Sequence, residues 1–265
     1  MSNGAKLRAA VKFDGGGPYL FSHDAGGWSE QLISAQVPNT PNLDQLACST
    51  SPKGDLHLCG LDLGQGTVYH ITNFADGSWQ SSWDANFPPP DIRPISQVAC
   101  ATDRFADLHV LAVTRGGTIY HTIRHADGTF ADSWEANFPA PDIRPIVRAS
   151  CAVDGANDLH VLAVTQSGTI YHTIRHADGT FADSWDGNFP PPDIRPVREA
   201  ACAFETATNL MHVAVLTDRH TQLNQRPLFY SARDLELGDW RPFSWQDVLA
   251  ALHVEGNLLT VDVSI

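Results

Sequence analysis

The chain has 265 residues and carries 30 acidic against 17 basic side chains, which gives a formal net charge of −13. Proteins that bind nucleic acid or an anionic membrane surface neutralise phosphate groups with an excess of Lys and Arg, so this composition excludes both as predicted partners. No apolar segment reaches the length of a membrane-spanning helix, and residues 1–6 lack the apolar stretch of a signal peptide. We therefore expect a protein without membrane insertion that acts in the cytoplasm or is secreted without a signal peptide.

The chain repeats itself with a period of 51 or 52 residues. Residues 109–145 and 160–196 differ at only 5 of 37 positions, and a looser copy begins at His57. Degenerate copies lie at both ends, so the approximate repeats cover 1–43, 44–94, 95–145, 146–196 and 197–265. A period of this length is typical of architectures built from similar units. We expect the repeats to form one domain over residues 1–265.

The two ends of the chain are expected to share one unit. Residues 7–13 resemble the second strand of a repeat and have no first strand before them. At the other end, residues 245–253 fit either a helix or an inner strand. The missing first strand is expected near residues 248–254, and residues 257–265 would supply one more strand. Pairing of the two termini would close the array and remove exposed sheet edges.

Each complete repeat predicts four short antiparallel strands. In the fourth copy these are residues 147–153, 159–165, 169–176 and, as an outer strand, 181–185. Asp178-Gly179 favours a hairpin, and the prolines of residues 188–193 exclude a central strand there. Four short strands at this period are typical of a β-propeller blade. The predicted fold is all-β: a single five-bladed β-propeller of four-stranded antiparallel blades, with the ring closed by its N- and C-terminal strands.

Four of the five cysteines fall at equivalent positions of the predicted innermost strands, beside alanines: Cys48, Cys100, Cys151 and Cys202. Small residues suit strands close to a central axis. Equivalent positions of neighbouring blades are too far apart for a disulfide, so we expect free thiols. No Cys-x-x-Cys or His-x-x-Cys spacing predicts a metal site, and we expect no metal and no cofactor.

Candidate ligand residues recur once per repeat. A tyrosine is followed by His70, His121 or His172, and four residues after the tyrosine stands Asn73, Arg124 or Arg175. Trp83, Trp134 and Trp185 end the predicted outer strands. A tryptophan face stacks on the C–H-rich face of a sugar, and Arg or His donates to its hydroxyl groups. Two alternatives stay open: the imidazoles form hydrogen bonds between blades, and the tryptophans pack the blade edges.

A proline-rich loop joins one repeat to the next and carries Asp91, Asp142 or Asp193, followed two residues later by an arginine. Prolines hold such a loop in place at low entropic cost. The carboxylates would accept hydrogen bonds from ligand hydroxyls in clefts between blades. Alternatively, each aspartate pairs with its arginine and fixes the loop.

The pattern Asp-Leu-His-Val-Leu-Ala-Val-Thr, Gly, Thr-Ile-Tyr-His-Thr-Ile-Arg-His-Ala-Asp-Gly-Thr-Phe resembles the repeats of tachylectin-type and fucose-lectin-type propellers. It is also similar to repeats of actinobacterial propeller proteins. The resemblance covers all five units, most clearly residues 55–204, and implies a propeller that binds sugar. The long proline-rich loop departs from the short crossover of those families.

These observations predict a multivalent carbohydrate-binding protein with shallow sugar sites between adjacent blades and glycans or glycoconjugates as partners. Near-identical copies disfavour an enzyme, which needs one asymmetric site, and the sequence contains no Gly-x-Ser-x-Gly and no His-Glu-x-x-His motif. The alternatives are a glycosidase-like or small-molecule enzyme at the axial funnel and a protein-interaction scaffold. For the enzyme, candidate acids in the irregular end repeats are Asp14, Asp24, Glu30, Asp218 and Glu236. The sequence leaves the oligomeric state open.

Overall fold

The computed structural model describes residues 7–12, 16–24, 27–85, 87, 92–139, 143–218 and 227–248. Their contacts divide the chain into two compact units. The first contains residues up to Thr114 together with Tyr120–Glu135, and the second contains Arg115–Ile119 and the chain from Ala136 onward. Each unit is described by itself. Among the described residues, no helix is long and apolar enough to cross a membrane.

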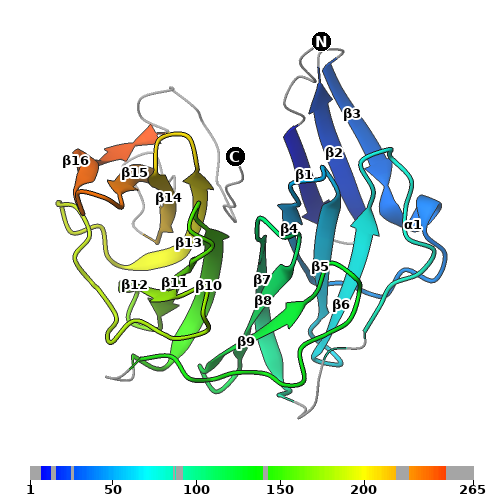
Figure 1. Ribbon diagram of the computed structural model, residues 1–265, viewed down its shortest axis with the longest axis horizontal. Coiled ribbons are helices and arrows are strands. Elements are labelled where there is room, and N and C mark those ends of the chain that lie inside the picture. The colour runs from blue at the N-terminus through cyan, green and yellow to red at the C-terminus, as the bar shows by residue number, and fades with distance from the viewer. Residues whose placement is uncertain are drawn as a thin grey trace. The chain divides into compact units, whose positions relative to one another are not determined.

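The first unit contains three antiparallel sheets of three strands (Figure 1). In chain order they are β1 (Leu7–Lys12), β2 (Pro18–Asp24) and β3 (Gly27–Leu32); β4 (Gln45–Thr50), β5 (Leu56–Asp62) and β6 (Thr67–Asn73); and β7 (Ile95–Thr102), β8 (Leu108–Thr114) and β9 (Ile119–Arg124). One short helix, α1 (Ile33–Gln36), follows β3. Consecutive strands are neighbours in every sheet.

The second unit contains two antiparallel sheets. The first is formed by β10 (Ile146–Val153), β11 (Leu159–Thr165) and β12 (Ile170–Arg175). The second has four strands, β13 (Val197–Glu205), β14 (Leu210–Thr217), β15 (Leu228–Asp234) and β16 (Trp240–Asp247). The middle strands β5, β8 and β11 are almost entirely buried on both faces, which explains why they read as continuous apolar runs.

The all-β prediction is confirmed, with five antiparallel sheets that match the five repeats. The predicted fourth strand is wrong for repeats two, three and four, where only isolated bridges occur among the described residues, at His121–Glu135 and Arg124–Phe130 and at the equivalent pairs of repeats two and four. Two more residues separate Phe130 from Glu135 than separate His121 from Arg124. The outer segment must therefore bulge and cannot keep a continuous register.

Five blades and a closed ring stay predictions, because the strands expected near residues 248–254 and 257–265 lie outside the described residues apart from Val248. Trp245, at the start of the segment with helix or inner-strand character, lies in β16, at the edge of its sheet opposite β13. Residues 245–247 therefore form part of an edge strand, and both predictions for them, a helix and an inner strand, are wrong.

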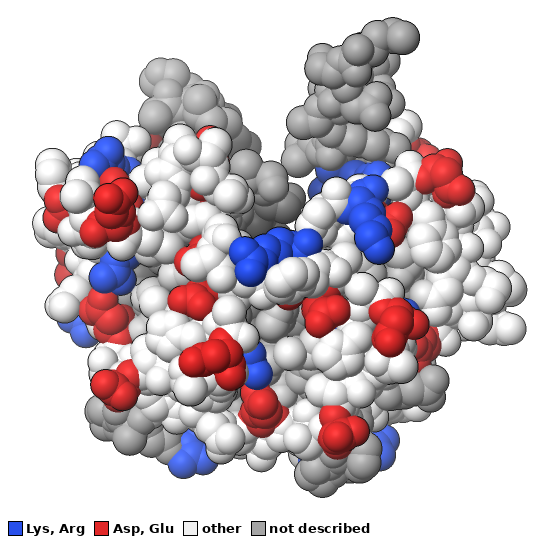
Figure 2. All heavy atoms as spheres, viewed as in Figure 1, with Lys and Arg blue, Asp and Glu red and all other residues white. Residues whose placement is uncertain are grey.

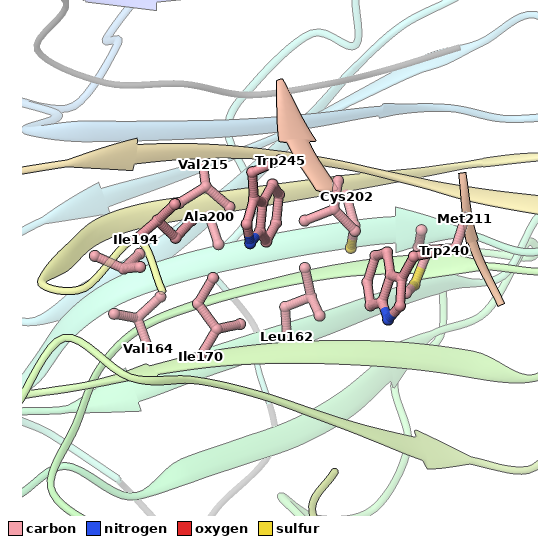
Figure 3. Packing of buried hydrophobic residues seen from close by; sticks show 13 residues of the cluster. Leu162, Val164, Ile170, Ile194, Ala200, Cys202, Met211, Val215, Trp240 and Trp245 are labelled. Atoms are coloured by element: carbon pink, nitrogen blue, oxygen red, sulfur yellow. The ribbon is translucent and has the colours of Figure 1, made fainter. Parts of the chain in front are cut away.

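Within each unit, consecutive sheets pack face to face through apolar clusters. In the second unit, Leu162, Val164 and Ile170 from one sheet lie among Cys202, Met211, Trp240 and Trp245 from the next (Figure 3). A comparable cluster in the first unit joins Leu61 and Val68 to Val98 and Leu108. Full burial of one such side chain contributes about 1.5–3 kcal/mol, so these stacked faces hold neighbouring sheets together.

The cysteines lie where the repeat places them. Cys48, Cys100, Cys151 and Cys202 are on β4, β7, β10 and β13, the first strands of their sheets. None of the five cysteines forms a disulfide bond among the described residues, as expected. Small side chains let first strands of neighbouring sheets approach closely: the Ser49 and Thr102 hydroxyl oxygens are 2.9 Å apart in the first unit.

Candidate functional site

Three sheets contain a buried pair of histidines, one on the middle strand and one on the third. Nδ1 of the first imidazole lies 3.0 Å from Nε2 of the second in each of the pairs His57–His70, His109–His121 and His160–His172. His57 is directly opposite Thr72 in the register, so His70 is its diagonal neighbour, within reach of a long side chain. The imidazoles therefore pair with each other within one sheet, and not with the imidazoles of a neighbouring sheet.

Burial lowers the pKa of three of these histidines, His57, His70 and His172, and keeps their rings neutral. The pKa of His57 is lowered to about 4, mainly by desolvation. The nearby Arg124 cation also lowers this pKa, and its effect is larger than the opposite effect of the Asp55 carboxylate. The same two causes, in that order, hold the pKa of His70 well below its usual value. Desolvation, with His160 next, lowers the pKa of His172 to about 3. At neutral pH each of these rings therefore has one donor and one acceptor nitrogen.

In the second unit a neutral pair completes a hydrogen-bonded chain. Arg233 Nη1 donates to Asp186 Oδ2 at 2.9 Å and to His172 Nδ1 at 3.4 Å. Since Nδ1 accepts, the proton of His172 is on Nε2, which donates to His160 Nδ1, and His160 Nε2 donates to Asp154 Oδ2 at 3.3 Å. The chain satisfies both buried rings and holds the Arg233 guanidinium in one orientation.

Three arginines occupy the same place near the end of the third strand, each beside an aromatic ring. The guanidinium carbon lies 6.0 Å from the Phe130 ring centre for Arg124, 5.9 Å from Phe181 for Arg175 and 5.8 Å from Trp240 for Arg233. Arg175 is 8% exposed. Arg124 differs from Arg233: it makes no hydrogen bond or ion pair with any described residue, and its Nε is buried without a partner.

Arg124 lines a cavity of about 200 Å³ in the first unit. The sheet of β4–β6 contributes one wall and the hairpin after β9 the other. The lining residues are Lys53, Asp55, His57, Thr72, Phe74, Gln80, Ala106, Arg124, Ala126, Asp127 and Gly128. A small cavity with ammonium, guanidinium, carboxylate, amide and hydroxyl groups beside an aromatic ring can bind a compact polar ligand.

The three predicted tryptophans lie in packing contacts. Trp134 is 9% exposed and its ring centre is 5.7 Å from that of Phe87. Trp185 stacks on Phe138 at 5.8 Å, and its Nε1 donates to Pro139 O at 3.1 Å. Trp83 Nε1 donates to Thr40 Oγ1 at 3.3 Å. The structure thus does not bring the tryptophans together with the arginines. It does bring Arg124 close to the His57–His70 pair of the preceding sheet.

Of the predicted loop aspartates, Asp91 and Asp142 lie outside the described residues, as does the candidate acid Asp14. Asp193 accepts from its own loop: Arg195 Nε lies 2.9 Å from both carboxylate oxygens. Beside this pair, Trp245 and the loop prolines line a cavity of about 400 Å³ in the second unit. The Asp193–Arg195 pair is the loop-fixing arrangement that the sequence left open.

Sequence reasoning missed Lys53, Asp55, Phe74 and Gln80. A signal was present for three of them, because Lys53, Phe74 and Gln80 belong to the loosest of the three central copies and differ from the residues at the same positions of the other two. Among the described residues, no group of three His, Cys, Asp or Glu side chains is placed to hold a metal ion. On the face drawn in Figure 2, acidic side chains are scattered over the surface and do not form one patch.

No family model and no curated protein sequence matches the chain. Solved structures of similar fold include AofleA from Arthrobotrys oligospora, with a TM-score of 0.65, 12% identity and coverage of 99% of this chain and 71% of that one. A variant of AofleA with three regularly spaced arginines replaced by alanine is similar to the same degree.

Two lectins are also similar. SapL1 lectin in complex with alpha methyl fucoside has a TM-score of 0.63 at 12% identity, over 90% of this chain and 76% of that one. BP39L lectin from Burkholderia pseudomallei has 0.60 at 16% identity, over 89% and 64%. At these identities the similarity shows a shared fold.

Proposed function

We propose that the protein binds carbohydrate at sites that lie between consecutive sheets of a unit and centre on the arginine near the end of the third strand. The observation that carries the proposal is the Arg124 cavity, in which a guanidinium that makes no hydrogen bond or ion pair with a described residue faces polar groups of the neighbouring sheet. A buried donor without a partner is unfavourable by about 1–3 kcal/mol. A ligand that accepts a hydrogen bond from Arg124 would remove that penalty.

The cavity has the chemistry with which proteins distinguish a saccharide from water. Thr72 and Gln80 offer a hydroxyl and an amide, each able to donate and accept, and Asp55 accepts. Phe74 lines the cavity and is 40% exposed, so its ring is available to pack against the apolar side of a sugar. The solved structure of SapL1 lectin with alpha methyl fucoside supports the proposal, because it places a sugar on this fold.

A second site of the same kind is proposed at Arg233 in the second unit, where the guanidinium contacts Asp186 and His172 of the preceding sheet. Arg175 occupies the same position of its own sheet. Arg124 and Arg233 each lie close to a histidine of the preceding sheet of their unit, His70 and His172. Two or more weak sites on one chain raise the avidity for a clustered glycan by orders of magnitude. Direct ligand contacts by Trp83, Trp134, Trp185, Asp91, Asp142 and Asp193 stay predictions.

A glycan array followed by calorimetric titration of the best ligand tests the proposal. We expect saturable binding that Arg124→Ala weakens at least tenfold, while the thermal unfolding midpoint changes little because the Arg124 side chain makes no hydrogen bond or ion pair with a described residue. Arg233→Ala is the matched comparison and should lower the midpoint, since it leaves Asp186 without its ion pair. An array without any signal from folded protein would refute carbohydrate binding.

A further inference from the structure

A second cavity lies in the second unit, where the fourth repeat meets the fifth. It has a volume of about 400 Å³ and is lined by the start of β12, by the proline-rich loop and by Trp245 of β16. In Figure 3, Ile170 and Ile194 of this lining lie at one end of the apolar cluster, whereas Trp240 lies at the other end. Arg233 is opposite Trp240 in the register, so the cavity is separate from the site proposed at Arg233.

The sequence departs from its own repeat at this cavity. The third and fourth repeats differ at only 5 of 37 positions in their near-identical stretch, and two of those five positions line the cavity. Gly187 stands where the third repeat has Ala136, and Pro191 stands where it has Ala140. The backbone does not require this glycine, because its φ lies outside the left-handed region and an added Cβ would lie 3.4 Å from the nearest Tyr171 ring atom, an ordinary contact. The missing side chain thus leaves room beside the cavity.

The fifth repeat adds an aromatic ring to the wall. In the fourth repeat a single tryptophan, Trp185, stacks on Phe138 of the preceding loop. In the fifth repeat two indoles contact Phe189, with ring centres 5.1 Å away for Trp240 and 6.2 Å away for Trp245. The additional indole, Trp245, is nearly parallel to Phe189, at 12°, and both rings line the cavity.

The inner walls of the cavity are apolar and rigid. The buried part of the lining, in which each side chain is at most 6% exposed, contains Ile170, Ile194, Val197 and Trp245. Phe189 and three consecutive prolines, residues 190–192, extend the apolar surface. Prolines and packed aromatic rings have little conformational freedom to lose, so these walls favour a ligand that is itself flat and rigid.

The mouth of the cavity is polar but carries no net charge. Among the described residues of the lining, only Asp193 and Arg195 are charged, and Arg195 Nε lies 2.9 Å from both carboxylate oxygens of Asp193. Both side chains are more than half exposed. Since the two charges neutralise each other, a neutral ligand needs no further counter-charge. A hydroxyl group, which both donates and accepts, can bond to this pair or to the hydroxyl of Thr169.

A monosaccharide suits this lining poorly. Eight of the twelve lining residues are apolar, and the polar side chains are those of Thr169, Asp193 and Arg195. Each sugar hydroxyl that leaves water needs a partner, and the apolar walls supply none. The volume lies within the range of about 300–1,000 Å³ that is usual for small-molecule sites.

We propose that this cavity binds a neutral aromatic compound of one or two rings that carries a hydroxyl group, of the chemical class of the phenols and naphthols. The rings lie against Trp245, the prolines and the aliphatic walls, and the hydroxyl group lies at the Asp193–Arg195 mouth. This site is additional to the proposed carbohydrate sites and does not depend on them.

Calorimetric titration of the full chain at neutral pH tests the proposal with four probes. 2-Naphthol is the expected ligand. Decahydro-2-naphthol has the same skeleton without aromatic rings, 2-naphthoate carries a negative charge, and methyl glucoside is a small saccharide. We expect one saturable site per chain for 2-naphthol and at least tenfold weaker binding of each of the other three probes.

Two variants place the site. Gly187→Leu extends a side chain into the open space beside the cavity, and the double variant Gly187→Ala/Pro191→Ala gives the fourth repeat the residues of the third. Gly187→Leu should weaken 2-naphthol binding at least tenfold, and the double variant should weaken it in the same direction. Ala136→Leu, at the same exposed position of the third repeat, is the matched control and should leave this binding unchanged. Each variant should unfold near the midpoint of the original protein.

The outcomes are distinct from those of the glycan array. Folded protein without a saturable site for 2-naphthol, or 2-naphthol binding that Gly187→Leu leaves intact, would overturn the proposal. So would equal affinity for decahydro-2-naphthol or 2-naphthoate, or binding of methyl glucoside that Gly187→Leu abolishes. None of these results bears on carbohydrate binding at Arg124, which Arg124→Ala tests separately.

Discussion

Acidification is predicted to unfold the protein through its buried histidines. His57 and His172 have folded-state pKa values of about 4 and about 3, below the ordinary value of 6.5. Their protonated forms are therefore favoured in the unfolded chain. The stability contributed by each neutral ring is complete above pH 6.5 and is lost progressively as the pH falls toward the folded-state pKa.

The magnitude follows from the pKa differences. Below pH 6.5 each of these histidines lowers the free energy of unfolding by about 1.4 kcal/mol per pH unit, which amounts to about 3 kcal/mol at pH 4. Two such groups approach the whole stability of an ordinary domain, which is about 5–15 kcal/mol. We expect loss of the native state before the pH reaches 4, ahead of the ordinary titration of most carboxylates.

Urea unfolding at half-unit steps from pH 7 to pH 4 measures this loss. The matched variant is His57→Asn, whose side-chain amide can accept or donate the hydrogen bond with His70 Nε2 but which cannot be protonated in this range. It should have a shallower dependence on pH, by about 1.4 kcal/mol per unit. Identical slopes for the variant and the original protein between pH 6.5 and 4 would refute the role assigned to His57, as would a stability that rises on acidification.

Three further predictions concern packing. Gly117→Ala and Gly168→Ala should lower the free energy of unfolding by about 2 kcal/mol or more, because φ is +78° and +74° and the new Cβ would lie 2.6 and 2.7 Å from the Cα atoms of Pro145 and Pro196. Gly77→Ala, with φ +89° and open space, is the control and should lose only about 1 kcal/mol; equal losses would contradict the contact argument. Trp134→Ala should lower stability by about 3–5 kcal/mol in urea unfolding, and an unchanged midpoint would mean that its contact with Phe87 stabilises little. The buried thiols of Cys59, Cys100, Cys151 and Cys202 should react with a thiol reagent only on unfolding, whereas half-buried Cys48 reacts first; rapid reaction of all five in native protein would argue against this packing.

Much of the fold could be predicted because its determinants are local. The 51-residue period, the Asp178-Gly179 hairpin and the apolar runs such as residues 159–165 each specify a strand or a turn within a few residues. The strand order within sheets and the positions of the cysteines follow from them. The prediction of a continuous outer strand was wrong, because two additional residues between Phe130 and Glu135 break its register with the third strand. Composition alone does not reveal this irregularity.

The sequence by itself determined the repeat, the all-β class and the position of the arginine in each copy. Only the tertiary structure decided which side chains meet. It paired His57 with His70 through the diagonal register of two strands, and it placed Trp134 against Phe87. It left Arg124 facing Asp55 and Gln80 across a cavity. The reason is physical: strands and turns depend on neighbours along the chain, whereas a site built from two sheets depends on residues about 50 to 70 positions apart that meet only when the sheets stack.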